Sequence, residues 1–95
     1  MLEKKIETEV CKYARSLGFD AMKQEWPGTH GAPDRLFITP QGKIFMVEFK
    51  SAKGKLSGHQ ARRIRRLKAM NVDVYITNNI ESGKWLMDMY YVHPE

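Results

Sequence analysis

The chain has 95 residues, which is enough for one small domain spanning residues 1–95 and too few for two. Its hydrophobic content of 42% and charged content of 28% are typical of a globular protein, and no apolar run is long enough to cross a membrane. The single cysteine, Cys11, excludes an internal disulfide and a zinc site built from cysteines. The first residues lack the apolar core of a signal peptide, so we expect a cytoplasmic protein.

The net charge of +5 is unevenly distributed along the chain. Residues 49–72 contain no acid, whereas residues 73–95 contain only one base, Lys84. A basic block beside an acidic segment suggests a surface that binds a polyanion in a fixed orientation. The alternative is that the arginines of residues 62–66 form a solvated helix face.

The first half of the chain predicts a helix followed by three strands. Apolar residues recur every three to four positions over residues 3–17, which predicts an amphipathic helix. Residues 19–26 are a weakly patterned strand, and residues 27–31 form a loop by composition. The clearest strands are residues 34–39 and 43–50, which are rich in isoleucine, phenylalanine and valine.

The three residues Pro40-Gln41-Gly42 predict a hairpin that fixes the register of these two strands. Proline suits the first turn position and glycine the left-handed one, which pairs Thr39 with Lys43. Because strand side chains alternate, two faces result. One carries Leu36, Ile38, Ile44 and Met46, and the other carries Arg35, Phe37, Phe45, Val47 and Phe49.

The second half predicts a helix, a strand and a segment whose structure stays open. Residues 57–70 read as a helix because Ser57 and Gln60 match a capping box. Residues 72–77 are dense in β-formers and predict a strand. Residues 84–92 are apolar and aromatic but fit neither period, so both helix and strand remain possible.

Two carboxylates and a lysine gather at one end of the predicted hairpin. Continuing the register places Asp34 opposite Glu48, and Lys50 follows on the same face. Carboxylates this close repel each other unless a cation lies between them or one is protonated. The backbone carbonyl of Phe49 offers another hard oxygen, and such ligands suit Mg²⁺ or Mn²⁺. The pattern predicts a divalent-metal site, with a cross-strand ion-pair network as the alternative.

These residues also carry a resemblance to a known family. The segments Gly31-Ala32-Pro33-Asp34-Arg35, Glu48-Phe49-Lys50 and Gly54-Lys55-Leu56-Ser57, together with Gln60, resemble the VRR-NUC domain. This is the virus-type replication-repair branch of the PD-(D/E)xK nuclease superfamily. The resemblance covers roughly the whole chain. It implies a restriction-endonuclease-like α/β fold with an αβββαβ core, in which a mixed sheet is flanked by helices.

The resemblance also assigns roles to individual residues. It implies that Asp34 and Glu48 hold the metal, that Lys50 is the catalytic lysine and that Gln60 lines the same site. The family also uses an acid on the first helix, for which Glu7 is our choice and Glu3 the alternative. Both could instead be solvated charges favoured by the helix dipole.

Together these features predict a metal-dependent DNA endonuclease, selective for branched DNA such as four-way junctions, in a bacterial or phage-infected cell. Its expected cofactor is Mg²⁺ or Mn²⁺, and no small-molecule cofactor is expected. The bases expected to hold phosphates are Lys53, Lys55, Arg62, Arg63 and Arg66. Two further interpretations are a non-catalytic nucleic-acid-binding module that uses the basic segment 53–68, and a small structural protein.

We also expect a homodimer. The face that carries Phe37, Phe45, Val47 and Phe49, together with residues 84–92, holds more apolar surface than two short helices can comfortably cover. The alternative is that the C-terminal segment folds back and completes a monomeric core. Arg35 is interpreted as structural or dimer-facing, and His30 and His59 as exposed surface residues.

Overall fold

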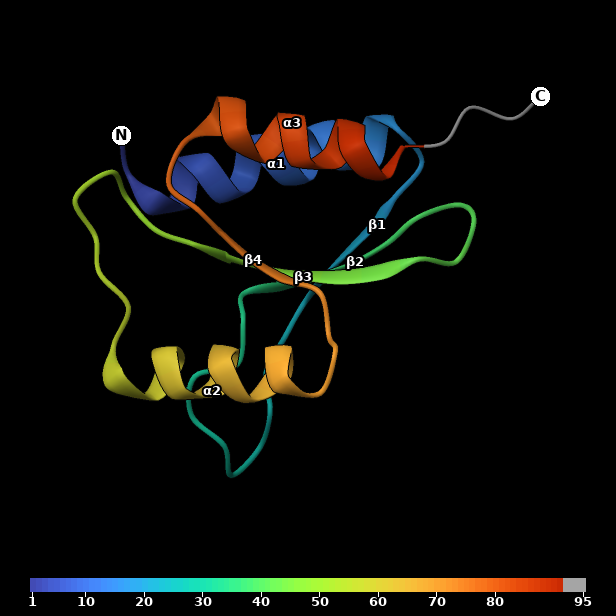
Figure 1. Cartoon of the computed structure of the whole chain (residues 1–95). Coiled ribbons are helices and arrows are strands. Elements are labelled where there is room, and N and C mark those ends of the chain that lie inside the picture. Colours follow the sequence, from blue (N-terminus) through green and yellow to red (C-terminus); the bar gives the residue numbers. More distant parts are fainter. Residues whose placement is uncertain (92–95) are drawn as a thin grey trace.

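The computed structural model describes residues 1–91, and these form a mixed sheet with helices on both faces (Figure 1). The order αβββαβ agrees with the expected core, and one further helix follows it. The elements are α1 (Glu3–Ser16), β1 (Asp20–Lys23), β2 (Arg35–Ile38), β3 (Ile44–Phe49), α2 (Gly58–Ala69), β4 (Val74–Thr77) and α3 (Ile80–Tyr90).

The strands lie in the order β1-β2-β3-β4, and the predicted hairpin register is confirmed. β1, β2 and β3 pair antiparallel, whereas β4 pairs parallel to β3. Leu36 faces Met46 across the β2–β3 pair, and Thr39 and Lys43 close the turn through a 2.9 Å hydrogen bond. Gly42 adopts a φ of +85°, the left-handed conformation that the turn requires.

The two faces of the sheet are covered by different helices. α1 and α3 pack on one face, and α2 covers the other (Figure 1). The first face holds the larger core, in which Phe37, Phe45, Val47 and Phe49 are fully buried against α1 and α3. Under α2, Ile64 and Leu67 pack with Val74 in a smaller cluster.

The segment that the sequence left open is helical. Residues 84–90 belong to α3, while Val92 lies outside the described residues. The expectation of surplus apolar surface on the Phe37 face is wrong, because α3 folds back over that face and buries it within one chain. The predicted strand 19–26 is also shorter than expected and ends at Lys23. None of the helices within residues 1–91 is long and apolar enough to cross a membrane.

A glycine allows α3 to approach α1 closely. Gly83 is buried in α3, and a Cβ atom added there would lie 2.4 Å from Cγ2 of Val10 on α1. The branched valine side chain has little freedom to move away. The helix pair that covers the large core therefore depends on the missing side chain.

Replacing Gly83 with alanine should lower the free energy of unfolding by about 1–3 kcal/mol, because the overlap with Val10 costs more than the gain in helix propensity. The matched control is Gly58→Ala in α2, where the added Cβ would approach only the flexible Arg62 side chain, at 3.3 Å. Denaturant unfolding of both variants tests this. Equal effects would contradict close packing at Gly83.

Candidate active site

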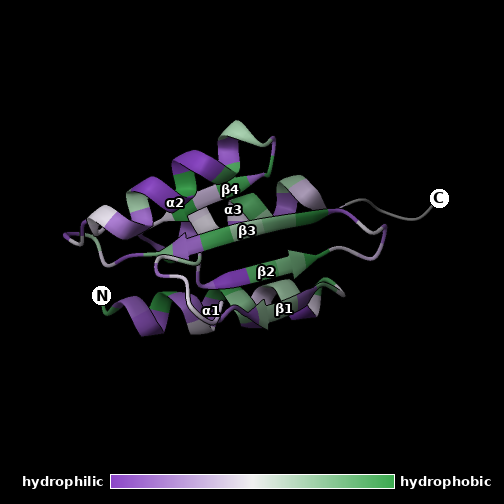
Figure 2. Ribbon diagram, turned by 90° about the horizontal axis from the view of Figure 1, so that it is seen from below, coloured by the Kyte–Doolittle hydropathy of each residue, from purple (hydrophilic) through white to green (hydrophobic). Residues whose placement is uncertain are grey.

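The predicted site lies at one end of the sheet, where four elements meet. The end of β3 and the start of β2 carry polar residues beside the start of α1, as the hydropathy colouring shows (Figure 2). The first turn of α2 approaches the same place, because Gln60 of that turn contacts Glu48 of β3.

Asp34 directly precedes β2 and is tied to the end of β3. Its Oδ2 accepts a hydrogen bond of 2.8 Å from the backbone N–H of Phe49. Burial raises the pKa of the Asp34 carboxyl above its ordinary value; the Phe49 hydrogen bond opposes this, and the nearby Glu7 and Glu3 carboxylates add to it. Asp34 is therefore both a partner of the β3 backbone and a carboxylate in an acidic environment.

Glu48 is the most deeply buried acid of the site, with 1% of its surface exposed. Its Oε2 accepts a 2.9 Å hydrogen bond from Nε2 of Gln60 and lies 3.3 Å from Nζ of Lys50. Burial, with the adjacent Asp34 carboxylate, raises the pKa of Glu48 from 4.5 to about 7, against the opposing effect of Lys50. Its other oxygen, Oε1, is buried and has no hydrogen-bond partner among the described residues.

Gln60 forms the predicted capping box and also contacts Glu48. Its Oε1 accepts from the backbone N–H of Ser57 at 2.9 Å, and the Ser57 hydroxyl accepts from the Gln60 N–H, which completes the capping box. Its Nε2 remains available and donates to Glu48. A residue of the capping box of α2 thus also fixes the buried acid.

The two candidate acids of α1 lie near the site but have other partners. Glu7 Oε2 is 2.7 Å from Nε of Arg35, and Arg35 also donates to the Ala21 carbonyl, which makes Arg35 a structural residue. Glu3 lies 4.0 Å from Nζ of Lys50. Within residues 1–91 no three histidine, cysteine or acidic side chains form a metal-binding cluster. Of the two acids, Glu7 has the larger effect on Asp34.

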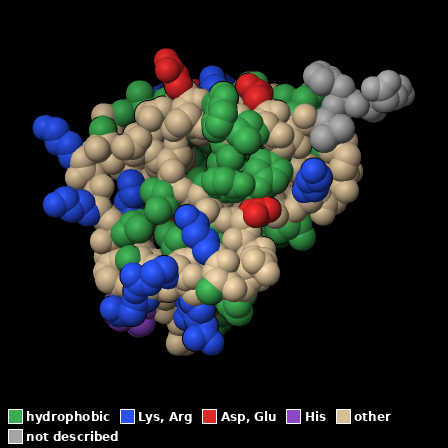
Figure 3. All heavy atoms as spheres, in the orientation of Figure 1, with side chains coloured by type: hydrophobic (Ala, Val, Ile, Leu, Met, Phe, Trp, Pro, Cys, Tyr) green, Lys and Arg blue, Asp and Glu red, His purple; other side chains and the backbone are tan. Residues whose placement is uncertain are grey.

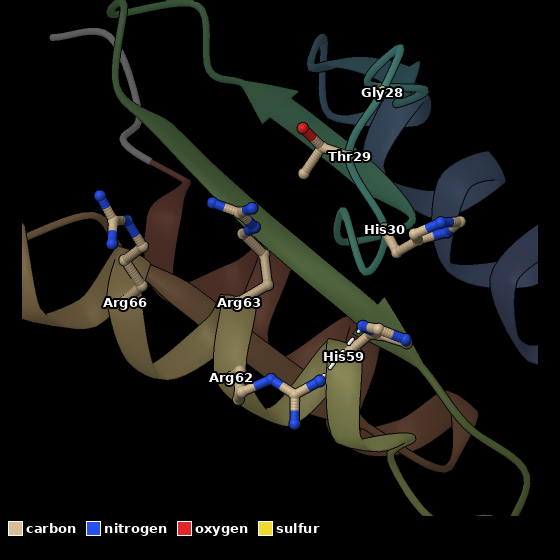
Figure 4. A pocket seen from close by; sticks show the side chains of 7 residues that line it. All are labelled: Gly28, Thr29, His30, His59, Arg62, Arg63 and Arg66. Atoms are coloured by element: carbon tan, nitrogen blue, oxygen red, sulfur yellow. Dashed lines mark hydrogen bonds between the residues drawn. The ribbon is translucent and has the colours of Figure 1, made fainter.

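The predicted phosphate-binding bases divide into two groups. Lys53 and Lys55 are exposed in the segment between β3 and α2, and no contact joins them to the acids. Arg62, Arg63 and Arg66 of α2 instead line a pocket, shown in Figure 4. Figure 3 shows the wider concentration of lysine and arginine side chains over α2 and the segment before it.

Two histidines of this pocket were not predicted as site residues. His30 and His59 place their ring centroids 5.2 Å apart across the pocket. Gly31 explains the approach, because its φ is +86° and an added Cβ would lie 2.6 Å from the His59 carbonyl oxygen. The only sequence signal was the glycine beside His30, since no local pattern connects two residues so far apart in the chain.

Comparison with known proteins agrees with this architecture. The profile of the VRR-NUC domain matches residues 2–79. The chain belongs to the VRR-NUC family. A phage protein named "Putative nuclease p44", from Acyrthosiphon pisum secondary endosymbiont phage 1, is 36% identical over 77 residues, which cover 81% of this chain and 83% of that protein. A solved VRR_NUC domain is 29% identical and aligns with a TM-score of 0.84 over 94% of this chain and 97% of its own.

The family is one of nucleases, and the residues present in this VRR-NUC domain suit a divalent cation. Glu48 provides a buried carboxylate oxygen with no partner, and Asp34 raises the cost of leaving it ionised. A cation bound between two carboxylates removes this repulsion. Carboxylate and carbonyl oxygens are also the ligands that Mg²⁺ and Mn²⁺ prefer.

The raised pKa of Glu48 makes the stability of the metal-free protein depend on pH. The unfolded chain releases this proton near pH 4.5 and the folded chain near pH 7, so the folded state binds more protons between these values. The free energy of unfolding should therefore fall as the pH rises through this window. In Glu48→Gln, which keeps an acceptor for Gln60, this part of the fall should disappear.

Denaturant unfolding in EDTA at about pH 4 and about pH 8 measures both proteins on the two sides of this window. The difference between the two pH dependences reports the Glu48 proton together with the effect of the Glu48 charge on the neighbouring Asp34. Identical pH dependence would contradict the assignment of a raised pKa to Glu48.

Proposed function

We propose that this VRR-NUC domain, acting as one unit over residues 1–95, is a Mg²⁺- or Mn²⁺-dependent DNA endonuclease. The observation that carries the proposal is the buried Glu48, with one oxygen unpartnered and with Asp34 and Lys50 beside it. A small domain has little stability to spare for a buried, repelled carboxylate. Such an arrangement is typical of a site that a cation completes.

In the proposed site, Asp34, Glu48 and the carbonyl of Phe49 would hold the metal. When bound, a divalent cation offsets the charge of the scissile phosphate and lowers the pKa of a water molecule. Gln60 fixes one oxygen of Glu48 and so leaves the other oriented for binding. Glu7 contributes directly or through water from α1, although it must share its charge with Arg35.

Lys50 is the proposed catalytic lysine. In hydrolysis the water oxygen forms a bond to phosphorus, the bond from phosphorus to the leaving oxygen breaks, and negative charge develops on the phosphoryl oxygens. The Lys50 Nζ, held 3.3 Å from Glu48, is placed as an ammonium to stabilise that charge. To take the proton of the water it would first have to release its own proton to solvent. The bases that would bind phosphates along the strand are Lys53, Lys55, Arg62, Arg63 and Arg66.

A non-catalytic nucleic-acid-binding module is the alternative from another class. The basic segment 53–68 alone would support it. A pure binding surface, however, gains nothing from buried carboxylates near phosphates. The acids at Asp34 and Glu48 therefore favour the nuclease.

The metal site is tested with Asp34→Asn. The asparagine keeps an oxygen that accepts from the Phe49 N–H, so the fold should persist, and it removes the charge that repels Glu48. Mn²⁺ should raise the melting temperature of the wild type by mass action and that of the variant less. Cleavage of labelled linear and branched DNA should fall about 10²-fold or more in the variant.

Lys50→Ala is the matched variant for the chemical step. It should keep the Mn²⁺-dependent stabilisation and DNA binding while losing turnover. Equal Mn²⁺ shifts in wild type and Asp34→Asn would rule out the metal site, and full activity of Lys50→Ala would make the lysine an ion-pair partner only.

We further propose that the domain acts as a homodimer on branched DNA in the cytoplasm of a bacterial or phage-infected cell. Cutting both strands of a four-way junction requires two sites at a fixed separation, which two-fold pairing supplies. The apolar side chains available for pairing lie on the outer side of α3, where Trp85 is 64% exposed and Met89 59% exposed. The phage origin of the 36% identical relative supports the proposed setting.

Sedimentation at micromolar concentration should therefore give a species of twice the chain mass of 11.1 kDa. Trp85→Glu should shift it to the monomer, whereas Met70→Glu, at a similarly exposed apolar residue that caps the C-terminal end of α2, should not. The monomeric variant should lose the preference for junctions over linear duplex. A monomeric wild type would contradict the dimer and leave the single-site nuclease unaffected.

A further inference from the structure

A basic pocket lies beside the candidate active site, between α2 and the loop that joins β1 to β2 (Figure 4). Its volume of about 250 Å³ is below the roughly 300 Å³ at which small-molecule pockets begin, so it suits a small group. Its lining consists of Gly28, Thr29, His30, His59, Arg62, Arg63 and Arg66 and contains no acid.

The charge of this pocket is not neutralised by the protein. Among residues 1–91 no carboxylate forms an ion pair with Arg62, Arg63 or Arg66. Arg63 lies with its guanidinium 5.6 Å from the centre of the Trp26 ring, and its Nε is buried without a hydrogen-bond partner among those residues. Guanidinium groups that share a pocket repel each other, and a bound anion reverses this cost. The planar donor geometry of arginine fits phosphate oxygens.

The imidazoles add donors on both sides of the pocket. His30 comes from the loop and His59 from the first turn of α2, and Nδ1 of His59 is 3.2 Å from Nη2 of Arg62. The loop is held in place, because Gln24 donates to the Pro33 carbonyl at 3.0 Å and Gly31 touches the His59 backbone. The pocket is therefore formed before any ligand arrives.

The same two segments build the pocket and the acid site. On α2, His59 lines the pocket and the next residue, Gln60, contacts Glu48. On the loop, His30 lines the pocket and Asp34 follows four residues later. A strand whose scissile phosphate lies at Asp34 and Glu48 would bring a neighbouring phosphate to the pocket.

We propose that this pocket binds one internal phosphodiester of the cleaved strand, next to the scissile one, and so sets the position of the strand. The proposal rests on the proposed nuclease function. It assigns His30 and His59, together with Arg63 and Arg66, to substrate positioning rather than to the chemical step. Binding a single phosphate by several fixed donors differs from a diffuse basic surface, which tolerates movement along the strand.

The test measures whether a substitution in the pocket and the removal of charge from one phosphate have additive or coupled effects on DNA affinity. DNA duplexes in which one phosphate of the labelled strand is replaced by an uncharged methylphosphonate are titrated in EDTA by fluorescence anisotropy. For the wild type, one replacement should weaken binding about tenfold. Arg66→Ala should weaken binding of unmodified DNA and lower the salt slope by about one, yet lose nothing more on that one modified duplex.

The matched control is Arg65→Ala, which removes the same charge from an exposed residue of α2 outside the pocket. Its effect should be additive with every methylphosphonate. His59→Ala should show the same loss of coupling as Arg66→Ala on that one modified duplex. The melting temperature of each variant shows that it is folded. Additive losses for Arg66→Ala at all positions, or equal behaviour of Arg65→Ala, would overturn the proposal.

Two further arms separate the possible outcomes. If coupling appears only with a terminal phosphate, tested by removing the 5′-phosphate from the duplex, the assignment to an internal phosphodiester is overturned. Cleavage of the unmodified duplex in Mn²⁺ tests the nuclease separately. A wild type that cleaves but shows no coupling overturns the pocket alone. Coupling without cleavage supports the pocket and contradicts the nuclease.

Discussion

The antiparallel register of β2 and β3 determines where the candidate catalytic acids of this domain lie. The hairpin turn at Gly42 fixes which residues face each other, and the pairing carries Asp34 to the end of β3, where it accepts from the Phe49 N–H. A slip of one residue would turn Glu48 toward the phenylalanine core and an apolar side chain toward Gln60. The buried core on one face of the sheet therefore fixes the register that positions the candidate acids on the other face.

That placement carries an energetic cost. Glu48 is buried beside a like charge, and among residues 1–91 the partners of its Oε2 are Gln60 and Lys50. The helix cap offsets part of the cost, because Gln60 would be ordered by Ser57 even without the acid. The same residue thus stabilises the start of α2 and orients a carboxylate. Fixing the acid therefore requires little additional conformational entropy.

The parts of the fold that the sequence predicted are those with local signals. The turn residues predicted the β2–β3 register, and the capping box predicted the start of α2. Over residues 84–92 the sequence left helix and strand open, because Leu86 and Met87 are buried while Trp85 and Met89 are apolar but exposed, which masks the helical period of α3. Because the sequence did not establish α3, the face that carries Phe37 and Phe45 was expected to have exposed apolar surface. The acids followed from the register, but the partner that Arg35 provides for Glu7 is a tertiary contact with no local pattern.

The assembly of the basic pocket is likewise a tertiary feature that local sequence signals do not predict. The sequence already singled out Arg62, Arg63 and Arg66 as phosphate-binding bases, but only the fold shows that they line one pocket together with the two histidines. What selects them is the loop before Asp34, which Gly31 brings against the backbone of His59. Because that loop also ends at Asp34, any movement of it would displace the acid and the pocket together. The close contact at Gly31 thus couples the geometry of the basic pocket to the position of the Asp34 carboxylate.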